Sequence, residues 1–155
     1  MRLIILGGTG MLGHTLWERL SRRFPDTYAT IRKGIEDYGD DCLYGSDRVI
    51  DHIDVMDLRM LEGTLRDVKP DVILNCIGIT KRREDPQNPI PSIALNAMLP
   101  HKLANLAADL KAKLIHFSTD CVFDGRKGHY SDDDPTNATD LYGRTKALGE
   151  VTGNN

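Results

Sequence analysis

The first thirteen residues constrain the fold of this chain more strongly than any other stretch. A short apolar run at residues 2–6 is followed by Gly7, Gly10 and Gly13, spaced three apart, and then by a helical pattern. Glycine permits a tight turn, lets backbone N–H groups approach a ligand, and lets the helix pack close to the strand. The helix N-terminus adds a positive end for an anion. The order strand, glycine turn and helix therefore predicts a dinucleotide-binding unit, with a purely structural turn as the alternative.

The rest of the chain alternates between expected strands and expected helices. Strand-like apolar runs occupy residues 27–31, 49–55, 72–78 and 114–118. Helical patterns occupy residues 10–23, 58–66 and 92–110. Asp57 and Ser92 are the expected N-caps of the last two helices, and polar loops are expected at residues 34–47, 80–91 and 125–140. Five β/α alternations predict an α/β fold with a doubly wound parallel sheet of the Rossmann type.

Two leucine stripes mark the expected buried faces of the helices. The first stripe consists of Leu12, Leu16 and Leu20. The second stripe comprises Leu95, Leu99, Leu103, Leu106 and Leu110. Pro100 lies inside the second helix, where it should remove a backbone hydrogen bond and bend the axis.

Tyr142 and Lys146 are the candidates for proton chemistry. They stand four residues apart, which on a helix places both side chains on one face, a turn apart. A free phenol has a pKa of about 10, and a nearby ammonium favours the phenolate and lowers that pKa. Such a tyrosine can exchange a proton with a carbonyl or alcohol oxygen. The spacing by itself also fits an ordinary surface helix, so the pair gains weight only from the rest of the chain.

The end of the second expected strand bears on the choice of cofactor. Arg32 and Lys33 follow that strand at once, and no acidic residue occurs between them and Glu36. In dinucleotide-binding folds an acid at this place binds the 2′-OH of NAD, whereas Arg accommodates the 2′-phosphate of NADP. The sequence therefore favours NADP(H), with NAD(H) as the second possibility. Two solvated charges at a strand end are the alternative.

Two further motifs carry a family resemblance. Residues 118–125 read STDCVFDG, and residues 142–150 read YGRTKALGE. Together with the glycine turn they resemble the extended short-chain dehydrogenase/reductase family. Within it they look like the dTDP-4-dehydrorhamnose reductase branch, whose signatures are STDYVFDG and YGxTKxxGE. The resemblance runs over the whole chain, and Cys121 departs from it because the branch usually has Tyr there, which puts the sugar in doubt and not the chemistry.

The resemblance implies roles for individual residues. Thr119 would bind the substrate oxygen, Tyr142 would donate the proton, and Lys146 would lower the tyrosine pKa and bind the ribose. The residues implied for the sugar site are Thr119, Asp120, Val122 and Phe123. The residues implied for the cofactor are Gly7, Thr9, Gly10, Met11, Leu12, Gly13, Arg32, Lys33, Asp54, Val55, Cys76, Gly78, Asn96, Tyr142 and Lys146.

Some of these cofactor assignments follow a pattern of the family. A pair of an acid and an apolar residue such as Asp54-Val55 brackets the adenine, although a turn or cap role is the alternative for Asp54. Asn75 would support the sheet, and Gly78 would lie near the cofactor. Asn96 would support the active-site lysine through water.

Charge and cysteine content exclude several other classes of protein. The formal net charge of -3 gives no global field that recruits nucleic acid or an anionic membrane. For the basic run at residues 81–83 a solvated face is preferred over phosphate binding. No apolar run approaches the ~20 residues that span a bilayer, and no signal peptide is recognisable. Cys42, Cys76 and Cys121 are odd in number and lack metal-ligand spacing, so we expect no metal site. Cys76 and Cys121 lie in or beside apolar strands, where we expect reduced core thiols and hence a cytoplasmic protein.

The hypothesis that follows is NADPH-dependent reduction of a nucleotide-linked 4-keto-6-deoxy sugar, in nucleotide-sugar and polysaccharide biosynthesis. One alternative is an epimerase or dehydratase of the same superfamily, since Asp120 follows Thr119 as an acid does in dehydratases, but no Glu comes next. Another is a non-catalytic NADP-binding regulatory subunit, like the β subunit of methionine adenosyltransferase in this branch. Related reductases continue with a C-terminal sugar-binding part. We therefore expect residues 1–155 to be an NAD(P)-binding Rossmann domain that is incomplete at its C-terminus. Turnover by these residues alone is not assured, and a homodimer is one option for their assembly.

Overall fold

The computed structural model describes residues 1–38, 46–83, 85 and 88–151, and Cys42 lies outside them. The chain divides into two compact units. The sheet unit comprises residues 1–77 and 105–115, and the tyrosine unit comprises residues 78–104 and 116–154. The helical segments are α1 Met11–Arg23, η1 Ile35–Tyr38, α2 Leu58–Val68, α3 Ile90–Ser92, η2 Ile93–Met98, α4 Leu99–Leu110, η3 Asp120–Val122 and α5 Leu141–Leu148.

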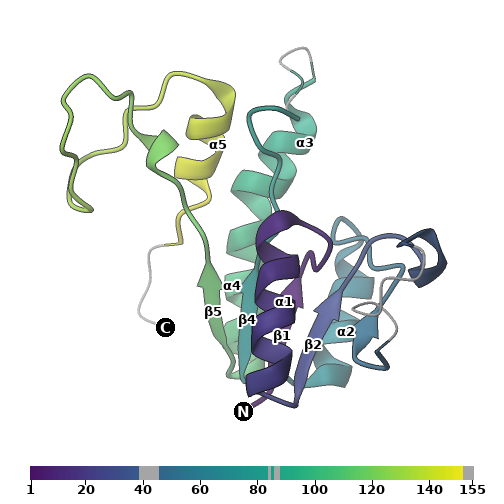
Figure 1. The fold of residues 1–155 in the computed structure, drawn as a ribbon. Coiled ribbons are helices and arrows are strands. Elements are labelled where there is room, and N and C mark those ends of the chain that lie inside the picture. The colour runs from purple at the N-terminus through teal and green to yellow at the C-terminus, as the bar shows by residue number, and fades with distance from the viewer. Residues whose placement is uncertain (39–45, 84, 86–87, 152–155) are drawn as a thin grey trace. The chain divides into compact units, whose positions relative to one another are not determined.

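Five short strands form one sheet in the order β3-β2-β1-β4-β5 (Figure 1). Their bounds are β1 Leu3–Leu6, β2 Thr27–Thr30, β3 Val49–Ile50, β4 Val72–Asn75 and β5 Lys113–His116. β1 pairs in parallel with β2 and with β4, and β2 pairs in parallel with β3. All four side chains of β1 are buried, as in a central strand that is covered on both faces. The strand order reverses beside β1, which confirms the predicted doubly wound, Rossmann-type α/β fold.

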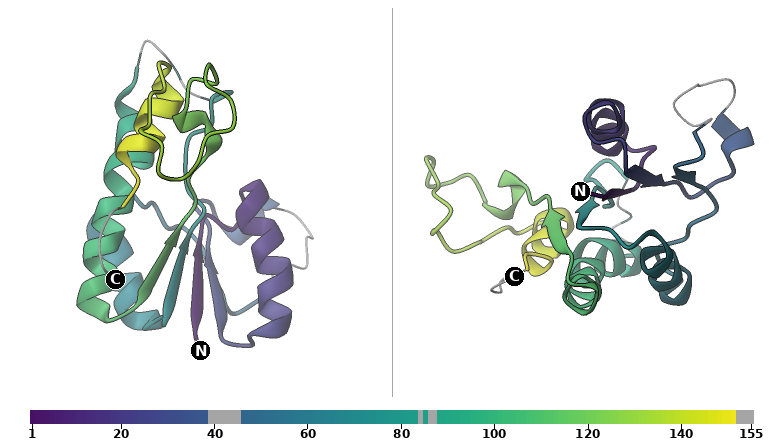
Figure 2. Two further views of the ribbon diagram at one scale, coloured as in Figure 1. Left: turned by 90° about the vertical axis from the view of Figure 1, so that its left-hand side faces the viewer. Right: turned by 90° about the horizontal axis from the view of Figure 1, so that it is seen from below.

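Helices cover both faces of this sheet. Figure 2 shows α1 on one face and α2 on the opposite face. The stripe predicted on α1 is wrong at one end, because Leu12 is 38% exposed whereas Trp17 is 3% exposed. An indole ring buries more apolar surface than a leucine, and the face that α1 turns to the sheet is centred on Gly13 and Trp17. Leu16 and Leu20 pack at the margin of the same core.

The third strand is much shorter than predicted. β3 ends at Ile50, although the apolar pattern extended to residue 55. His52 adopts a left-handed backbone with a φ of 55°, which interrupts the extended run. Asp54 therefore lies in the turn that leads to α2 and not at the end of a strand. β4 and β5 also end before the predicted residues 78 and 118.

The helix predicted at residues 92–110 begins earlier and is not a regular α-helix. The helical chain starts two residues before Ser92, so this serine is buried inside the helix and does not cap it. The segment η2 is π-helical, and the N–H of Leu99 reaches back five residues to the Ala94 carbonyl. Pro100 follows directly and has no N–H to donate. The distortion expected at Pro100 thus takes the form of a widened turn before it.

Helix starts elsewhere follow the expected capping chemistry. The carboxylate of Asp57 accepts the N–H groups of Arg59 and Met60 and caps α2 as predicted. Asp140 caps α5 in the same way. In the part of the chain that the structure describes, no helix has the length and apolar character needed to cross a bilayer.

Candidate functional site

The glycine turn between β1 and α1 has the geometry that the sequence predicts. Gly7 has a φ of 86°, in the left-handed region that side chains avoid. A Cβ atom on Gly13 would lie 2.1 Å from the Gly7 carbonyl oxygen, so only glycine lets the helix approach the turn this closely. Gly10 is the N-cap of α1 and donates its N–H to the same carbonyl at 3.1 Å. Backbone contacts therefore close the turn.

The N-terminus of α1 can accept an anion. Its first turn contains no acidic residue, and no side chain of the described residues caps it. The first helical hydrogen bond runs from His14 to Gly10, which leaves the N–H groups of Met11, Leu12 and Gly13 without helical partners. Met11 is 91% exposed. These N–H groups and the positive end of the helix dipole suit a diphosphate.

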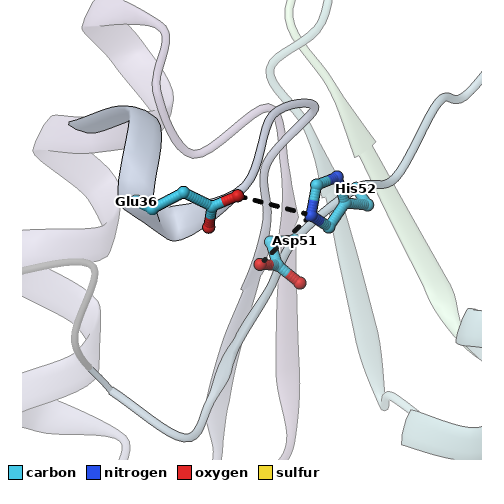
Figure 3. A group of neighbouring side chains, drawn as sticks. All are labelled: Glu36, Asp51 and His52. Carbon is cyan, nitrogen blue, oxygen red and sulfur yellow. Dashed lines mark ion pairs between the residues drawn. The ribbon is translucent and has the colours of Figure 1, made fainter.

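Charged residues surround the turn that follows β2. Arg32 and Lys33 are exposed, and neither forms an ion pair with any other residue that the structure describes. Beside them Glu36 meets Asp51 and His52 (Figure 3). The Nε2 atom of His52 lies 4.0 Å from Oε1 of Glu36 and 3.9 Å from Oδ2 of Asp51. Glu36 and Asp51 therefore share a cationic partner when His52 is protonated.

The remaining cofactor residues predicted in the sheet unit have visible structural roles. The exposed Asp54 side chain accepts the N–H of Met56 at 2.9 Å, which is the turn role given as its alternative. Val55 is buried, and Thr9 is exposed within the glycine turn. Burial raises the pKa of the Cys76 thiol to about 11, so this free cysteine stays protonated.

Lys146 is buried in the tyrosine unit, where 6% of its surface is exposed. Its ammonium donates a hydrogen bond to the Phe117 carbonyl at 2.6 Å and lies 3.3 Å from Nε2 of His116. Burial lowers the pKa of Lys146 because it disfavours the charged form, and the Glu150 carboxylate opposes this shift. The lysine is therefore a charge held inside the protein, which argues against an ordinary surface helix.

His116 belongs to this environment, although the sequence analysis did not single it out. It ends β5 and stands 30 residues from Lys146 along the chain. Burial, followed by the charges of Lys146 and His101, lowers the pKa of its imidazole to about 4. The ring is therefore neutral at pH 7. No sequence signal was available, because the strand expected at residues 114–118 placed His116 in its middle, whereas β5 ends at His116 in the structure.

Tyr142 lies one helical turn before Lys146 on α5 and is half-buried. The neighbouring Gly143 is packed so closely that a Cβ atom would lie 2.2 Å from the Cys121 carbonyl oxygen. Helix α5 therefore packs directly on η3, whose N-cap is Thr119. The three predicted catalytic residues thus come from two elements that are in contact within one unit.

Two neighbours hold the Thr119 hydroxyl. Its oxygen accepts the N–H of Cys121 at 3.2 Å, and it donates to Oδ1 of Asp120 at 3.2 Å. A substrate oxygen that bonds to this hydroxyl must therefore replace the Asp120 carboxylate as its acceptor.

A cavity of about 900 Å³ lies in the tyrosine unit. It is lined by all four residues predicted for the sugar site, namely Thr119, Asp120, Val122 and Phe123. Phe123 stacks on Tyr130 with the ring centroids 4.4 Å apart, which gives the cavity an aromatic wall. Tyr142 and Lys146 are not among the lining residues. The cavity thus brings the predicted sugar-site residues together without Tyr142 and Lys146.

Asn96 has different partners from the one that the resemblance implies. Its side chain is 1% exposed and bonds to the N–H and the carbonyl of Ile79 and to the Thr145 hydroxyl. Gly78 lies beside it, because a Cβ atom there would be 3.1 Å from the Asn96 oxygen. These bonds tie the segment after β4 to α5, and the indirect contact of Asn96 with the lysine stays a prediction.

Asp140 fixes the N-terminus of α5 and is a further residue that the sequence analysis missed. Its carboxylate accepts the Gly143 N–H at 2.8 Å and pairs with the Lys81 ammonium at 2.9 Å. Both hydrogen bonds lower the pKa of Asp140, and the bond from Gly143 contributes more than the one from Lys81. The Lys81 side chain is still 62% exposed, so this ion pair is compatible with the solvated face that was the preferred interpretation. The available signal was an acid directly before the helix with Tyr142 and Lys146.

The family model described as RmlD substrate binding domain matches residues 1–153. Methionine adenosyltransferase 2 subunit beta of Xenopus tropicalis is 31% identical over 152 residues, which cover 96% of this chain and 41% of that protein. The dTDP-4-dehydrorhamnose reductase of Streptomyces griseus is 31% identical over 150 residues, which cover 96% of this chain and 43% of that protein. The chain thus spans less than half the length of these curated relatives.

Solved structures share the fold of this chain. A hypothetical dTDP-4-dehydrorhamnose reductase from Sulfolobus tokodaii has a TM-score of 0.79 at 28% identity, over 96% of this chain and 50% of that one. The dTDP-4-dehydrorhamnose reductase of Bacillus anthracis, solved in complex with NADP, has a TM-score of 0.76 at 24% identity, over 96% of this chain and 47% of that one. Given the family match over residues 1–153, the chain belongs to the RmlD substrate binding domain family, a dTDP-4-dehydrorhamnose reductase-like branch of the extended short-chain dehydrogenases/reductases.

Proposed function

We propose that this chain provides the cofactor-binding and proton-transfer parts of an NADP(H)-dependent oxidoreductase. Its substrate would be a nucleotide-linked 4-keto-6-deoxy sugar. The observation that carries the proposal is the buried Lys146 ammonium, one helical turn from Tyr142 on a helix packed against the Thr119 segment. Family membership and the reductases among the relatives support the reaction class.

In the proposed reaction the chain supplies the proton and holds the ketone. Tyr142 donates its phenolic proton to the ketone oxygen, and Thr119 turns its hydrogen bond from Asp120 to that oxygen. The phenolate that remains is stabilised by the Lys146 cation, whose attraction is strong in a buried setting. A bound nicotinamide would supply the hydride that reaches the ketone carbon, so that hydride and proton together turn the carbonyl into an alcohol.

The sheet unit would bind the dinucleotide, and NADP(H) would be preferred over NAD(H). The glycine turn and the free N–H groups of α1 suit the diphosphate. Arg32 and Lys33 are exposed and form no ion pair with the other described residues, so they offer charge to a 2′-phosphate. Glu36, the acid that would otherwise repel this phosphate, lies in the ion-pair cluster with His52.

A non-catalytic NADP-binding regulatory subunit is the second candidate function. It is favoured by the methionine adenosyltransferase subunit, which is as similar to this chain as the reductase is. The presence of Thr119, Tyr142 and Lys146 speaks for catalysis instead. An epimerase or dehydratase of the same superfamily is less favoured, since Cys121 and not Glu follows Asp120.

Mass spectrometry of the sugar after incubation with the full-length protein and NADPH tests the proposal, because turnover by residues 1–155 alone is not assured. The substrate probe is a dTDP-linked 4-keto-6-deoxy sugar, and reduction adds a hydride and a proton to it. We expect the reduced sugar with the wild-type protein and almost none with Tyr142→Phe. NADPH binding without any reduced sugar would instead favour the regulatory subunit.

A further inference from the structure

The ammonium of Lys146 is held by acceptors that no catalytic role explains. It bonds to the Phe117 carbonyl at 2.6 Å, and Nε2 of His116 lies 3.3 Å away. Both acceptors come from the end of β5 and the residue after it, and Lys146 comes from α5. An ammonium carries three N–H donors, so two acceptors leave one N–H for anything else. We propose that His116 is a positioning residue, which together with the Phe117 carbonyl fixes the Lys146 ammonium and leaves a single N–H in a defined direction.

This arrangement needs a neutral imidazole whose proton is on Nδ1, because only then can Nε2 accept from the ammonium. Burial and the nearby positive charges keep the ring neutral, since they lower the pKa of His116 to about 4. Two more titratable groups face the pair. His101 on α4 contacts the Leu148 carbonyl through its own Nε2 at 2.7 Å, and Glu150, just after α5, attracts the Lys146 ammonium.

A fixed ammonium matters because an amine on a four-carbon chain otherwise samples many rotamers. A buried ammonium that loses one of two acceptors is also less stable in its charged form, so its proton is lost at lower pH. His116 thus acts through Lys146, on both its direction and its charge. The consequence for catalysis rests on the proposed function, whereas the contact itself does not.

Nitrogen-15 NMR of the imidazole rings tests the contact without any substrate. In the wild-type protein we expect an unprotonated Nε2 on His116 between about pH 5 and pH 8. Lys146→Met should raise the pKa of His116, because a neighbouring positive charge is lost. A protonated Nε2 in the wild type, or a His116 pKa that does not respond to Lys146→Met, would overturn the proposal whatever the activity of the protein.

Kinetics on two substitutions of His116 test the consequence. His116→Phe keeps a ring and removes the acceptor, whereas His116→Gln keeps an acceptor oxygen. We expect the Phe variant to lose about tenfold in kcat and to shift the alkaline limb of its pH profile down by about one unit, and the Gln variant to restore most of both. His129→Phe is the matched control, since His129 is an exposed histidine of the same unit.

The outcomes separate the inference from the proposed function. If folded His116→Phe has the pH profile of the wild type, or if His116→Gln does not restore kcat and the alkaline limb, His116 has only a structural role. If the Phe variant does not fold, the Gln variant and the NMR measurement decide. If the full-length wild-type protein reduces no keto-sugar, the proposed function fails, and the NMR measurement still decides whether His116 positions Lys146.

Discussion

The two units of this protein provide positive electrostatic potential in different ways. The sheet unit offers backbone N–H groups at the start of α1, and no side chain of the described residues caps them. The tyrosine unit buries the Lys146 side chain against a carbonyl and an imidazole. The first arrangement depends on missing side-chain atoms at Gly7 and Gly13, and the second depends on the identity of particular side chains. We therefore expect substitutions in the sheet unit to lower stability and cofactor affinity through steric clashes. In the tyrosine unit we expect substitutions to lower turnover through the loss of a chemical group.

Among these predictions, Tyr142→Phe should have the largest effect, because it removes a chemical group and not packing volume. The proposed proton donor is lost while the ring stays, so reduction should fall by ~10²–10⁴-fold and NADPH affinity should hardly change. Steady-state kinetics and NADPH titration measure the two effects. Lys146→Met is the contrasting variant, since it should lower turnover and also weaken NADPH. If both variants reduce the keto-sugar at the wild-type rate, the regulatory-subunit hypothesis moves ahead.

The pH dependence of stability should reveal the buried pair in the tyrosine unit. The folded-state pKa of His116 is about 4 and its ordinary value is 6.5, so the unfolded chain binds a proton more readily between these values. Stability is therefore complete above about pH 6.5 and falls as the pH drops towards 4, by ~1–2 kcal/mol once solvent screening of the half-buried ring is taken into account. Urea unfolding of the wild type and His116→Gln over this range measures it. Parallel curves for the two proteins would show that His116 is not the cause.

Gly13→Ala should destabilise the sheet unit through a steric clash. The new Cβ would lie 2.1 Å from the Gly7 carbonyl oxygen, so α1 must move. Overpacking of this kind costs ~1–3 kcal/mol of unfolding free energy and should also weaken NADPH. Gly63→Ala on α2 is the matched control, because a Cβ there meets nothing within 4 Å and should stabilise the helix by ~1 kcal/mol. Equal effects of the two substitutions in urea unfolding would contradict the steric explanation.

Arg32→Ala should have the smallest effect and act on one cofactor only. Loss of an exposed cation that meets a 2′-phosphate should weaken NADPH about tenfold and leave NADH unchanged. Calorimetric titration with both cofactors measures this difference. Arg59→Ala, an exposed arginine on α2, is the control and should change neither affinity. An equal loss for NADH and NADPH would show that Arg32 does not read the phosphate.

The sequence by itself determined the features that follow from local backbone rules. The spacing of Gly7, Gly10 and Gly13 predicted the turn, because a left-handed φ and a close helix approach involve only neighbouring residues. The alternation of apolar runs and helical patterns predicted the doubly wound sheet, since short connections and handedness leave few other topologies. The four-residue spacing of Tyr142 and Lys146 placed them one turn apart on α5.

Tertiary structure alone decided contacts between distant residues and the environment they create. Leucine periodicity showed that α1 has an apolar face, but only packing against the sheet showed that Trp17 is buried and Leu12 is not. The same holds for His116 and Lys146, which meet across 30 residues of chain. A pKa shift depends on burial and on neighbouring charges, and both arise only when separate elements pack together. The spacing of the motif therefore located the lysine, while the folded protein determined how its charge is held.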